Sequence, residues 1–399
     1  MIFKALAVRE GDCFLTEYKK NDELIRILID GGNDKKETVE LFEKLKLPDK
    51  HINLIICTHY DSDHINGIIG LLEEGYTFDE IWLPEILGSV AAKIGSKGIR
   101  EVVEELNRIS EEEYRQLMKF DECLLTEFEN DFNNNKEVET DIDINFSSNL
   151  WGAKTYEYVS FYDDYGYENM LNYSNCIDCS NHNQCDRYNY MVLKHTIIDT
   201  VNKTSMLMSL MISKTYSGSK IVWLKNTNSL VSNKISTNID VLALNSEVSR
   251  RRPYISLHKL LKYIYALSKS NKFSLVFKFD LESYPNILFS ADSDFNFLTL
   301  GENIQLKENS IVTAPHHGSL HNQLAYNRIA VGSMICDKSL TFVRSDRDNP
   351  IGRPCDRYKR LSKKYCTKCT AKYARRANVR LTLKRNGTFR VNKKACKCE

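Results

Sequence analysis

Short apolar runs in the first 75 residues predict strands that alternate with helices. The stretch from Phe3 to Tyr18 is interrupted by Gly11-Asp12, which is typical of two strands joined by a turn. After that turn, the spacing of apolar residues predicts strands at 25–29 and 54–57 and helices at 36–45 and 67–72.

The pattern changes between residues 88 and 235. Residues 100–119 have the spacing of a highly charged helix, and residues 130–149 are acidic, rich in Asn and poor in core-forming side chains. No period indicates internal repeats. This part of the chain is therefore predicted to be a large insertion or a separate lobe.

Strand patterns return in the second half, at 239–244, 273–279, 286–290 and 310–314. Strands and helices on both sides of an insertion predict an α/β sandwich. The predicted domains are a first half of the core at 1–87, the insertion at 88–235, a second half of the core at 236–350, and a basic, Cys-rich segment at 351–399.

Composition places the chain among soluble globular proteins. Of 399 residues, 42% are hydrophobic and 27% are charged, and no apolar run approaches the roughly 20 residues of a membrane helix. The N-terminus lacks the pattern of a secretion signal, so a cytoplasmic location is expected. In that compartment the twelve cysteines are expected to be thiols or metal ligands rather than disulfides.

Charge is distributed unevenly along the chain. Residues 353–399 hold 17 Lys or Arg and only two acids, Asp356 and Glu399, although the whole chain has a net charge of +2. A basic segment of this density indicates a polyanionic partner, with nucleic acid as the first choice. The alternative is a solvated tail that balances an acidic body.

Three apolar runs end in residues that can bind metal ions. The first is followed within a few residues by His59, Asp61, Asp63 and His64, the second by Asp292, and the third by His316-His317. A single Asp after a strand is usually a turn residue or a helix cap, and a single His is usually structural. The joint pattern predicts a site for one or two divalent ions, either Zn or Mn.

The arrangement of these residues resembles a known family. His59-Tyr60-Asp61-Ser62-Asp63-His64 is similar to the His-x-His-x-Asp-His signature of the metallo-β-lactamase superfamily, with Asp61 in place of the second His. That replacement is also similar to the soluble hydrolase domain of the ComEC competence proteins. Further similar segments follow in the family's order: 11–15, 27–32, 271–276, the strand that reaches Asp292, and 315–319.

The resemblance implies a four-layer αββα sandwich with a metal site at one edge of two facing sheets. It implies that Asp63 and His64 bind one ion, that His59 and Asp61 bind the other, and that Asp292 bridges both. His316 or His317 would complete the second position, and the spacing does not choose between them. Asp30 would orient a ligand imidazole from behind. Asp61 or Asp63 would also relay a proton during catalysis.

The chain departs from the superfamily pattern in two places. The superfamily usually supplies a further His to the first metal from the middle of the chain, where only His182, His195 and His258 are candidates. A later His-Pro pair of the family appears here as Arg353-Pro354. The first metal position is therefore expected to be weak, or empty until substrate binds.

Two cysteine clusters predict structural zinc. The first comprises Cys176, Cys179, His182 and Cys185, and the second comprises Cys366, Cys369, Cys396 and Cys398, with Cys355 as a substitute ligand. Asn386-Gly387 lies between alternating segments and predicts a β-hairpin inside the second cluster, as in a zinc ribbon. The alternative for both clusters is a set of reduced thiols without metal.

Basic residues around this hairpin are predicted to contact the phosphate backbone of nucleic acid. They are Lys363, Lys364, Arg375, Arg376, Arg380, Lys384, Arg385 and Arg390.

Together, the metal site and the basic segment predict a metal-dependent phosphodiesterase, with a nuclease acting on DNA or RNA as the first choice. Two other functions stay open. One is hydrolysis of a small molecule such as a cyclic nucleotide, a lactone or a thioester. The other is nucleic-acid binding without catalysis on a decayed hydrolase fold. No membrane partner is expected, and protein partners are not predicted.

Overall fold

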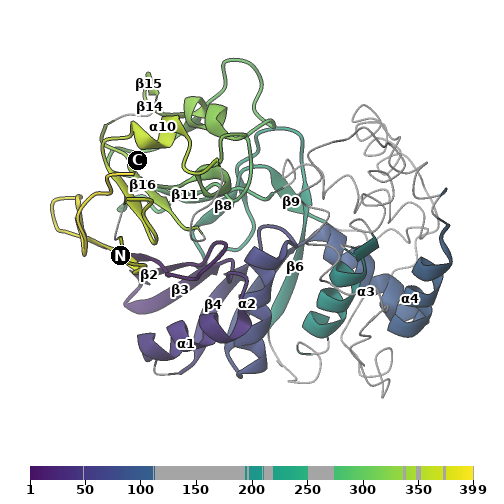
Figure 1. Cartoon of the computed structure of the whole chain (residues 1–399). Coiled ribbons are helices and arrows are strands. Elements are labelled where there is room, and N and C mark those ends of the chain that lie inside the picture. Colours follow the sequence, from purple (N-terminus) through teal and green to yellow (C-terminus); the bar gives the residue numbers. More distant parts are fainter. Residues whose placement is uncertain are drawn as a thin grey trace. The chain divides into compact units, whose positions relative to one another are not determined.

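The computed structural model describes residues 1–47, 49–110, 194–195, 197–208, 219–249, 274–335, 338–346, 352–371 and 374–398, with the single residues 112 and 210. The chain divides into two compact units (Figure 1). One unit contains residues 1–85, 216–249 and 271–399, and the other contains residues 86–215 and 250–270. Among the described helices, none combines the length and the apolar character needed to cross a bilayer.

The first unit is mixed α/β and is built on two large sheets. In the described residues the larger sheet has nine strands in the order β19-β18-β1-β2-β3-β4-β5-β6-β9, of which β3 to β6 are parallel. Its strands are β1 (Ile2–Ala5), β2 (Phe14–Lys20), β3 (Glu23–Ile29), β4 (His51–Ile56), β5 (Thr77–Pro84), β6 (Lys220–Asn226), β9 (Ser246–Val248), β18 (Val379–Leu383) and β19 (Phe389–Val391).

The second large sheet has seven described strands in the order β17-β16-β13-β11-β10-β8-β7, and β11, β13, β16 and β17 are parallel. Its strands are β7 (Asn233–Lys234), β8 (Val241–Ala243), β10 (Phe277–Phe279), β11 (Ile287–Phe289), β13 (Ile311–Thr313), β16 (Thr341–Arg344) and β17 (Lys364–Cys366). A small third sheet contains β12 (Ile304–Gln305), β14 (Ile329–Val331) and β15 (Met334–Ile335).

The two large sheets pack face to face through aromatic and aliphatic side chains. The rings of Phe14 and Phe289 lie 6.4 Å apart, and those of Trp82 and Phe277 lie 6.0 Å apart, so each pair joins one sheet to the other. These residues are almost fully buried and belong to one continuous apolar cluster. Burial of this apolar surface is the main favourable contribution to folding of the unit.

Helices α1 (Lys35–Leu45) and α2 (Ser62–Glu73) lie together beside β3 and β4 (Figure 1). Asp34 caps α1 by accepting a hydrogen bond from the backbone N–H of Glu37. Helix α2 approaches the loop after β3 so closely that a Cβ on Gly67 would lie 1.9 Å from the carbonyl oxygen of Gly31. This contact fixes the helix that carries Asp63 and His64.

Short helical segments lie on the outer face of the second large sheet, the face that is turned away from the larger sheet, and they pack against an apolar cluster there. They are η2 (Pro315–Gly318), η3 (Gln323–Arg328) and α10 (Asp356–Lys359). Tyr326 of η3 packs on Phe342 of β16 with ring centroids 5.8 Å apart, and Tyr358 of α10 belongs to the same cluster. The mixed α/β character agrees with the sequence, whereas the complete four-layer arrangement stays a prediction.

The second unit contains α4 (Ile99–Arg108) and most of α3 (Glu85–Lys97). Helix α4 buries Ile99, Val102, Val103 and Leu106, the repeat expected of one helical face. The described helix ends at Arg108, and residues 111 and 113–119 of the predicted helix lie outside the described residues. Strand β6 lies inside the range predicted for the insertion, yet it pairs with β5 in the central sheet. The predicted domain limits stay a prediction.

The C-terminal segment contributes strands to both large sheets. Strands β18 and β19 form the hairpin predicted around Asn386-Gly387, and β18 also pairs with β1, with Ile2 opposite Thr382. Strand β17 extends the other sheet beside β16. The structure therefore differs from a free-standing zinc ribbon, because these strands cover sheet edges that would otherwise be open.

Candidate metal centre

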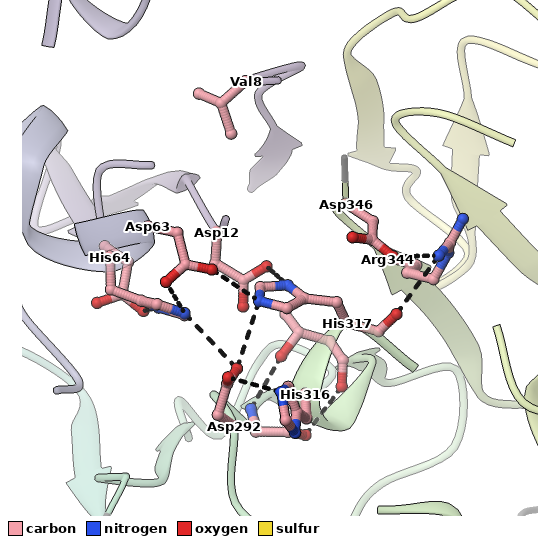
Figure 2. A network of polar contacts seen from close by, with 12 residues as sticks. Val8, Asp12, Asp63, His64, Asp292, His316, His317, Arg344 and Asp346 are labelled. Atoms are coloured by element: carbon pink, nitrogen blue, oxygen red, sulfur yellow. Dashed lines mark hydrogen bonds and ion pairs between the residues drawn. The ribbon is translucent and has the colours of Figure 1, made fainter. Parts of the chain in front are cut away.

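The seven predicted ligands come together at one end of the first unit. The loop after β4 carries His59 and Asp61, and the first turn of α2, which begins at Ser62, carries Asp63 and His64. The turn after β11 carries Asp292, and the turn after β13 carries His316 and His317. The carboxyl ends of parallel strands are the usual place for functional loops in α/β folds. Figure 2 shows Asp63, His64, His316 and His317 around Asp292.

Asp292 lies at the centre and divides the ligands into two groups. Its Oδ1 is 3.6 Å from Nε2 of His64 and 3.5 Å from Nε2 of His317. Its Oδ2 is 3.4 Å from Nε2 of His316 and 4.0 Å from Nε2 of His59. The two oxygens of one carboxylate therefore face two different pairs of imidazoles.

The two remaining carboxylates extend these groups. Asp63 lies 3.3 Å from Nε2 of His317 and 3.7 Å from Nε2 of His64, on the Oδ1 side. Asp61 lies 3.8 Å from Nε2 of His59, on the Oδ2 side. We call these the Asp63 position and the Asp61 position. The sequence left His316 and His317 as alternatives for one position, whereas the structure places one at each.

Each imidazole is held from behind through its Nδ1 atom. His64 contacts Asp30 at 2.8 Å, and His317 contacts Asp12 at 3.1 Å. His59 contacts the hydroxyl of Thr58 at 3.0 Å, and His316 contacts Oδ1 of Asn322, also at 3.0 Å. The four Nε2 atoms are thereby turned toward the centre. A carboxylate partner raises the basicity of a metal-binding imidazole. Both carboxylate partners, Asp30 and Asp12, contact histidines of the Asp63 position.

Asp12 was interpreted from the sequence only as part of a turn. The structure buries it at 2% exposure against His317, with its backbone N–H donating to the carbonyl of Asp63 at 3.2 Å. Gly11 permits this approach, because it has φ +89° and a Cβ there would lie 1.7 Å from the carbonyl oxygen of Asp63. The Gly-Asp pair between the two predicted strands was the available signal.

Backbone strain concentrates at the same place. Asp30, Ala291, His316 and His317 are non-glycine residues with φ values of 57°, 46°, 45° and 51°. Such conformations are costly for non-glycine residues and gather at functional sites. The backbone N–H of His316 donates to the carbonyl of Ala291 at 2.9 Å, which ties the two strained turns together.

The electrostatics of the cluster favour bound positive charge. Burial by itself lowers the pKa of His64, but Asp63, Asp30 and Asp292 raise that pKa to about 10. Burial and the charge of His64 lower the pKa of His59 to about 4. Burial by itself raises the pKa of Asp292, but His317, His64 and His316 lower it to about 2. Without metal, protons on His64 and His317 therefore balance the carboxylates.

The residues present fit a divalent ion. Among the described residues, none forms a hydrogen bond with the buried Nε2 atoms of His59, His64 or His317. Buried polar atoms without a partner are unfavourable, and ions bound at the two positions would satisfy all three. Two donors that share one ion at about 2.1 Å lie roughly 3.4 Å apart. The observed separations of 3.3–4.0 Å lie close to that value. Imidazole and carboxylate together suit zinc or manganese.

A buried arginine network supports the His316–His317 turn (Figure 2). Arg344 donates to Asp346 at 2.6 Å and to the carbonyl of His317 at 3.5 Å. Arg353 also donates to Asp346, at 3.3 Å. The backbone N–H of Cys355 donates to the carbonyl of Gly318 at 2.8 Å, so the segment that carries Arg353 lies against the histidine turn.

The other predicted sites are only partly described. The cluster Cys176, Cys179, His182 and Cys185 lies outside the described residues, as does His258, and His195 is exposed in the second unit. Among the predicted phosphate contacts, Lys363, Arg375, Arg380, Lys384, Arg385 and Arg390 are exposed. Arg376 instead donates to the carbonyls of Val8 and Asp346, and Lys364 donates to the carbonyl of Leu361.

A comparison with known proteins finds a match in the N-terminal part of the chain, which carries several of the candidate ligands. No curated protein matches the sequence. Residues 11–77 match a family model described as the metallo-beta-lactamase superfamily, whose members are generally metal-dependent hydrolases. The matched range contains Asp12, Asp30, Asp61 and the whole α2 helix with Asp63 and His64. Over these residues, the chain therefore has the sequence pattern of a metallo-beta-lactamase superfamily protein.

Proposed function

We propose that this protein is a metal-dependent phosphodiesterase that acts on nucleic acid. The observation that carries the proposal is the convergence of four imidazole Nε2 atoms and the carboxylates of Asp61 and Asp63 around Asp292. A divalent ion bound there would lower the pKa of water and offset charge on a phosphoryl oxygen. Asp63, His64, His317 and Asp292 would hold it at one position, and His59, His316, Asp292 and Asp61 at the other.

Asp61 is the better placed of the two predicted catalytic carboxylates to accept a proton. It begins α2, yet its side chain makes no capping hydrogen bond and is 41% exposed. Burial of the site raises its pKa, which brings the carboxylate closer to the range of a general base. Asp63, in contrast, is directed to both His64 and His317.

The charge around the site suits an anionic substrate. Arg353 is 22% exposed and lies beside the histidine turn. Burial lowers the pKa of His316, and the positive charge of Arg353 contributes to the same lowering. Asp346 is shared between Arg344 and Arg353, so the pair keeps an excess positive charge. We therefore assign Arg353 to a non-bridging phosphate oxygen of the substrate.

The catalytic part of the proposal is tested with labelled DNA and RNA, with bis(p-nitrophenyl) phosphate as a small substrate, in the presence of Zn or Mn. We expect Asp292→Ala to abolish cleavage and Asp61→Asn to reduce kcat. Asp294→Asn is the matched control, because its carboxylate bonds only locally to Asn296. Equal turnover by wild type and Asp292→Ala would refute the proposal.

The choice of nucleic acid over a small molecule has its own test. Replacing Arg380, Arg385 and Arg390 with Gln removes three exposed charges. We expect the slope of log K for nucleic-acid binding against log salt concentration to become shallower by roughly 0.7–0.9 per lost phosphate contact. Replacing the exposed Lys36, Lys44 and Lys46 is the control of equal charge. If the protein cleaves the small substrate and the arginine variant binds nucleic acid as the wild type does, the small-molecule alternative is favoured.

A further inference from the structure

Four cysteine sulfurs gather at the end of β17, in the same unit as the metal centre. Sγ of Cys398 lies 3.5 Å from Sγ of Cys366 and 3.7 Å from Sγ of Cys369. The sulfurs of Cys366, Cys396 and Cys398 all lie within 4.8 Å of one another. Sulfurs that share a tetrahedral zinc ion at about 2.3 Å lie roughly 3.8 Å apart, whereas a disulfide would bring two of them to about 2.05 Å. The separations fit a shared ion.

The backbone around the sulfurs supports thiolates. The N–H of Cys366 donates to Sγ of Cys396 at 3.1 Å, and the N–H of Cys396 donates to the carbonyl of Lys364 at 2.8 Å. A backbone N–H directed at sulfur stabilises the thiolate, which is the form of cysteine that binds metal.

Nearby cations suit the negative charge of such a site. Four thiolates with one Zn²⁺ carry a charge of −2. Arg344 donates to the carbonyl of Lys368 at 3.0 Å, inside the loop between Cys366 and Cys369. Lys393 donates to the carbonyl of Cys366 at 2.7 Å. Part of the basic character of the C-terminal segment is thus explained by this cluster.

We propose that Cys366, Cys369, Cys396 and Cys398 bind one structural zinc ion, separate from the metal centre at Asp292. All four tetrahedral positions are filled by sulfur, so the ion has no open position for substrate. It joins the last residues of the described chain to β17 and to the loop at Lys368. The hairpin β18–β19 lies between the two ligand pairs, so the ion closes the segment that pairs with β1.

The test uses the full-length protein and does not depend on catalysis. Zinc per chain is measured after dialysis, in a background that carries Cys176→Ser and Cys179→Ser to remove the other predicted cluster. We expect the double variant Cys366→Ser/Cys398→Ser to lose one equivalent of zinc. Asp292→Asn should leave that equivalent in place, which separates this site from the proposed active site. Cys355→Ser is the matched control, since Cys355 is buried as Cys366 is, and should retain zinc.

Spectroscopy of the same background, with Asp292→Asn and all four cysteines intact, provides a test that is independent of whether the serine variants fold. X-ray absorption should show four sulfur neighbours at about 2.3 Å, and cobalt substitution should give the intense absorption of a tetrahedral cobalt thiolate. Absence of zinc, a shell of nitrogen and oxygen only, or loss of zinc on replacing Cys355 would overturn the proposal.

Discussion

Replacing Asp30 with Asn tests whether the structure has identified the group that orients His64. Asp30 is 1% exposed, and its Oδ1 accepts a hydrogen bond from the backbone N–H of Thr58 at 2.8 Å. Its Oδ2 accepts from the Thr58 hydroxyl at 2.7 Å and contacts Nδ1 of His64 at 2.8 Å. The backbone N–H of Thr58 can only donate, so an asparagine must keep its oxygen at that side and place its NH₂ group at the other.

That NH₂ group would face Nδ1 of His64, which must then accept rather than donate. The imidazole proton would move to Nε2, the nitrogen that faces Asp292 at 3.6 Å. Because a protonated Nε2 cannot bind a metal, we expect metal affinity at the Asp63 position to fall 10–100-fold, or about 1.4–2.7 kcal/mol. The free energy of unfolding of the metal-free protein should also fall by about 1.5–3 kcal/mol for each charge-assisted hydrogen bond removed.

The assay is competition for zinc between the protein and a chromophoric chelator, together with urea unfolding of the metal-free protein. Asp34→Asn is the matched control, because it removes an exposed carboxylate that only caps α1, and Asn is an equally good cap. We expect wild-type zinc affinity in that variant. Wild-type affinity in the folded Asp30→Asn protein would show that this carboxylate does not set the orientation of His64.

Three further predictions follow from the site and its support. Binding of zinc at pH 7 should release protons, because the pKa of His64 is raised to about 10 in the metal-free protein and its proton must leave. The zinc affinity should therefore rise with pH. Calorimetry in buffers of different ionisation enthalpy measures the protons released, and a result of zero would contradict this prediction. Gly67→Ala should destabilise the fold by at least about 1–3 kcal/mol and weaken metal binding, since its Cβ would collide with the carbonyl of Gly31. Gly75→Ala, in open space at φ +84°, should cost about 1–2 kcal/mol with metal affinity unchanged; equal effects of both variants on metal binding would contradict the role of the Gly67 contact. Arg376→Gln should lower stability more than Arg385→Gln does in thermal unfolding, because Arg376 donates to two backbone carbonyls, whereas Arg385 is exposed.

The sequence by itself determined the strands that deliver the site and the residues at their ends. His59 to His64 follow β4, Asp292 follows β11, and His316-His317 follow β13, as the apolar runs predicted. These signals are local: alternation and run length report burial, and a polar cluster at the end of a buried run reports a functional edge. For the same reason the helix at Lys35–Leu45 and the hairpin at Asn386-Gly387 were predictable.

Only the tertiary structure decided which residues meet. It placed His317 with Asp63 and His64, although about 250 residues separate them in the chain. It also brought Asp12 behind His317 and inserted β18 beside β1. Such pairings depend on strand order and on the packing of two sheets, which local periodicity does not encode. The roles of the Gly11-Asp12 turn behind His317 and of β18 beside β1 are therefore visible only in the folded sheets.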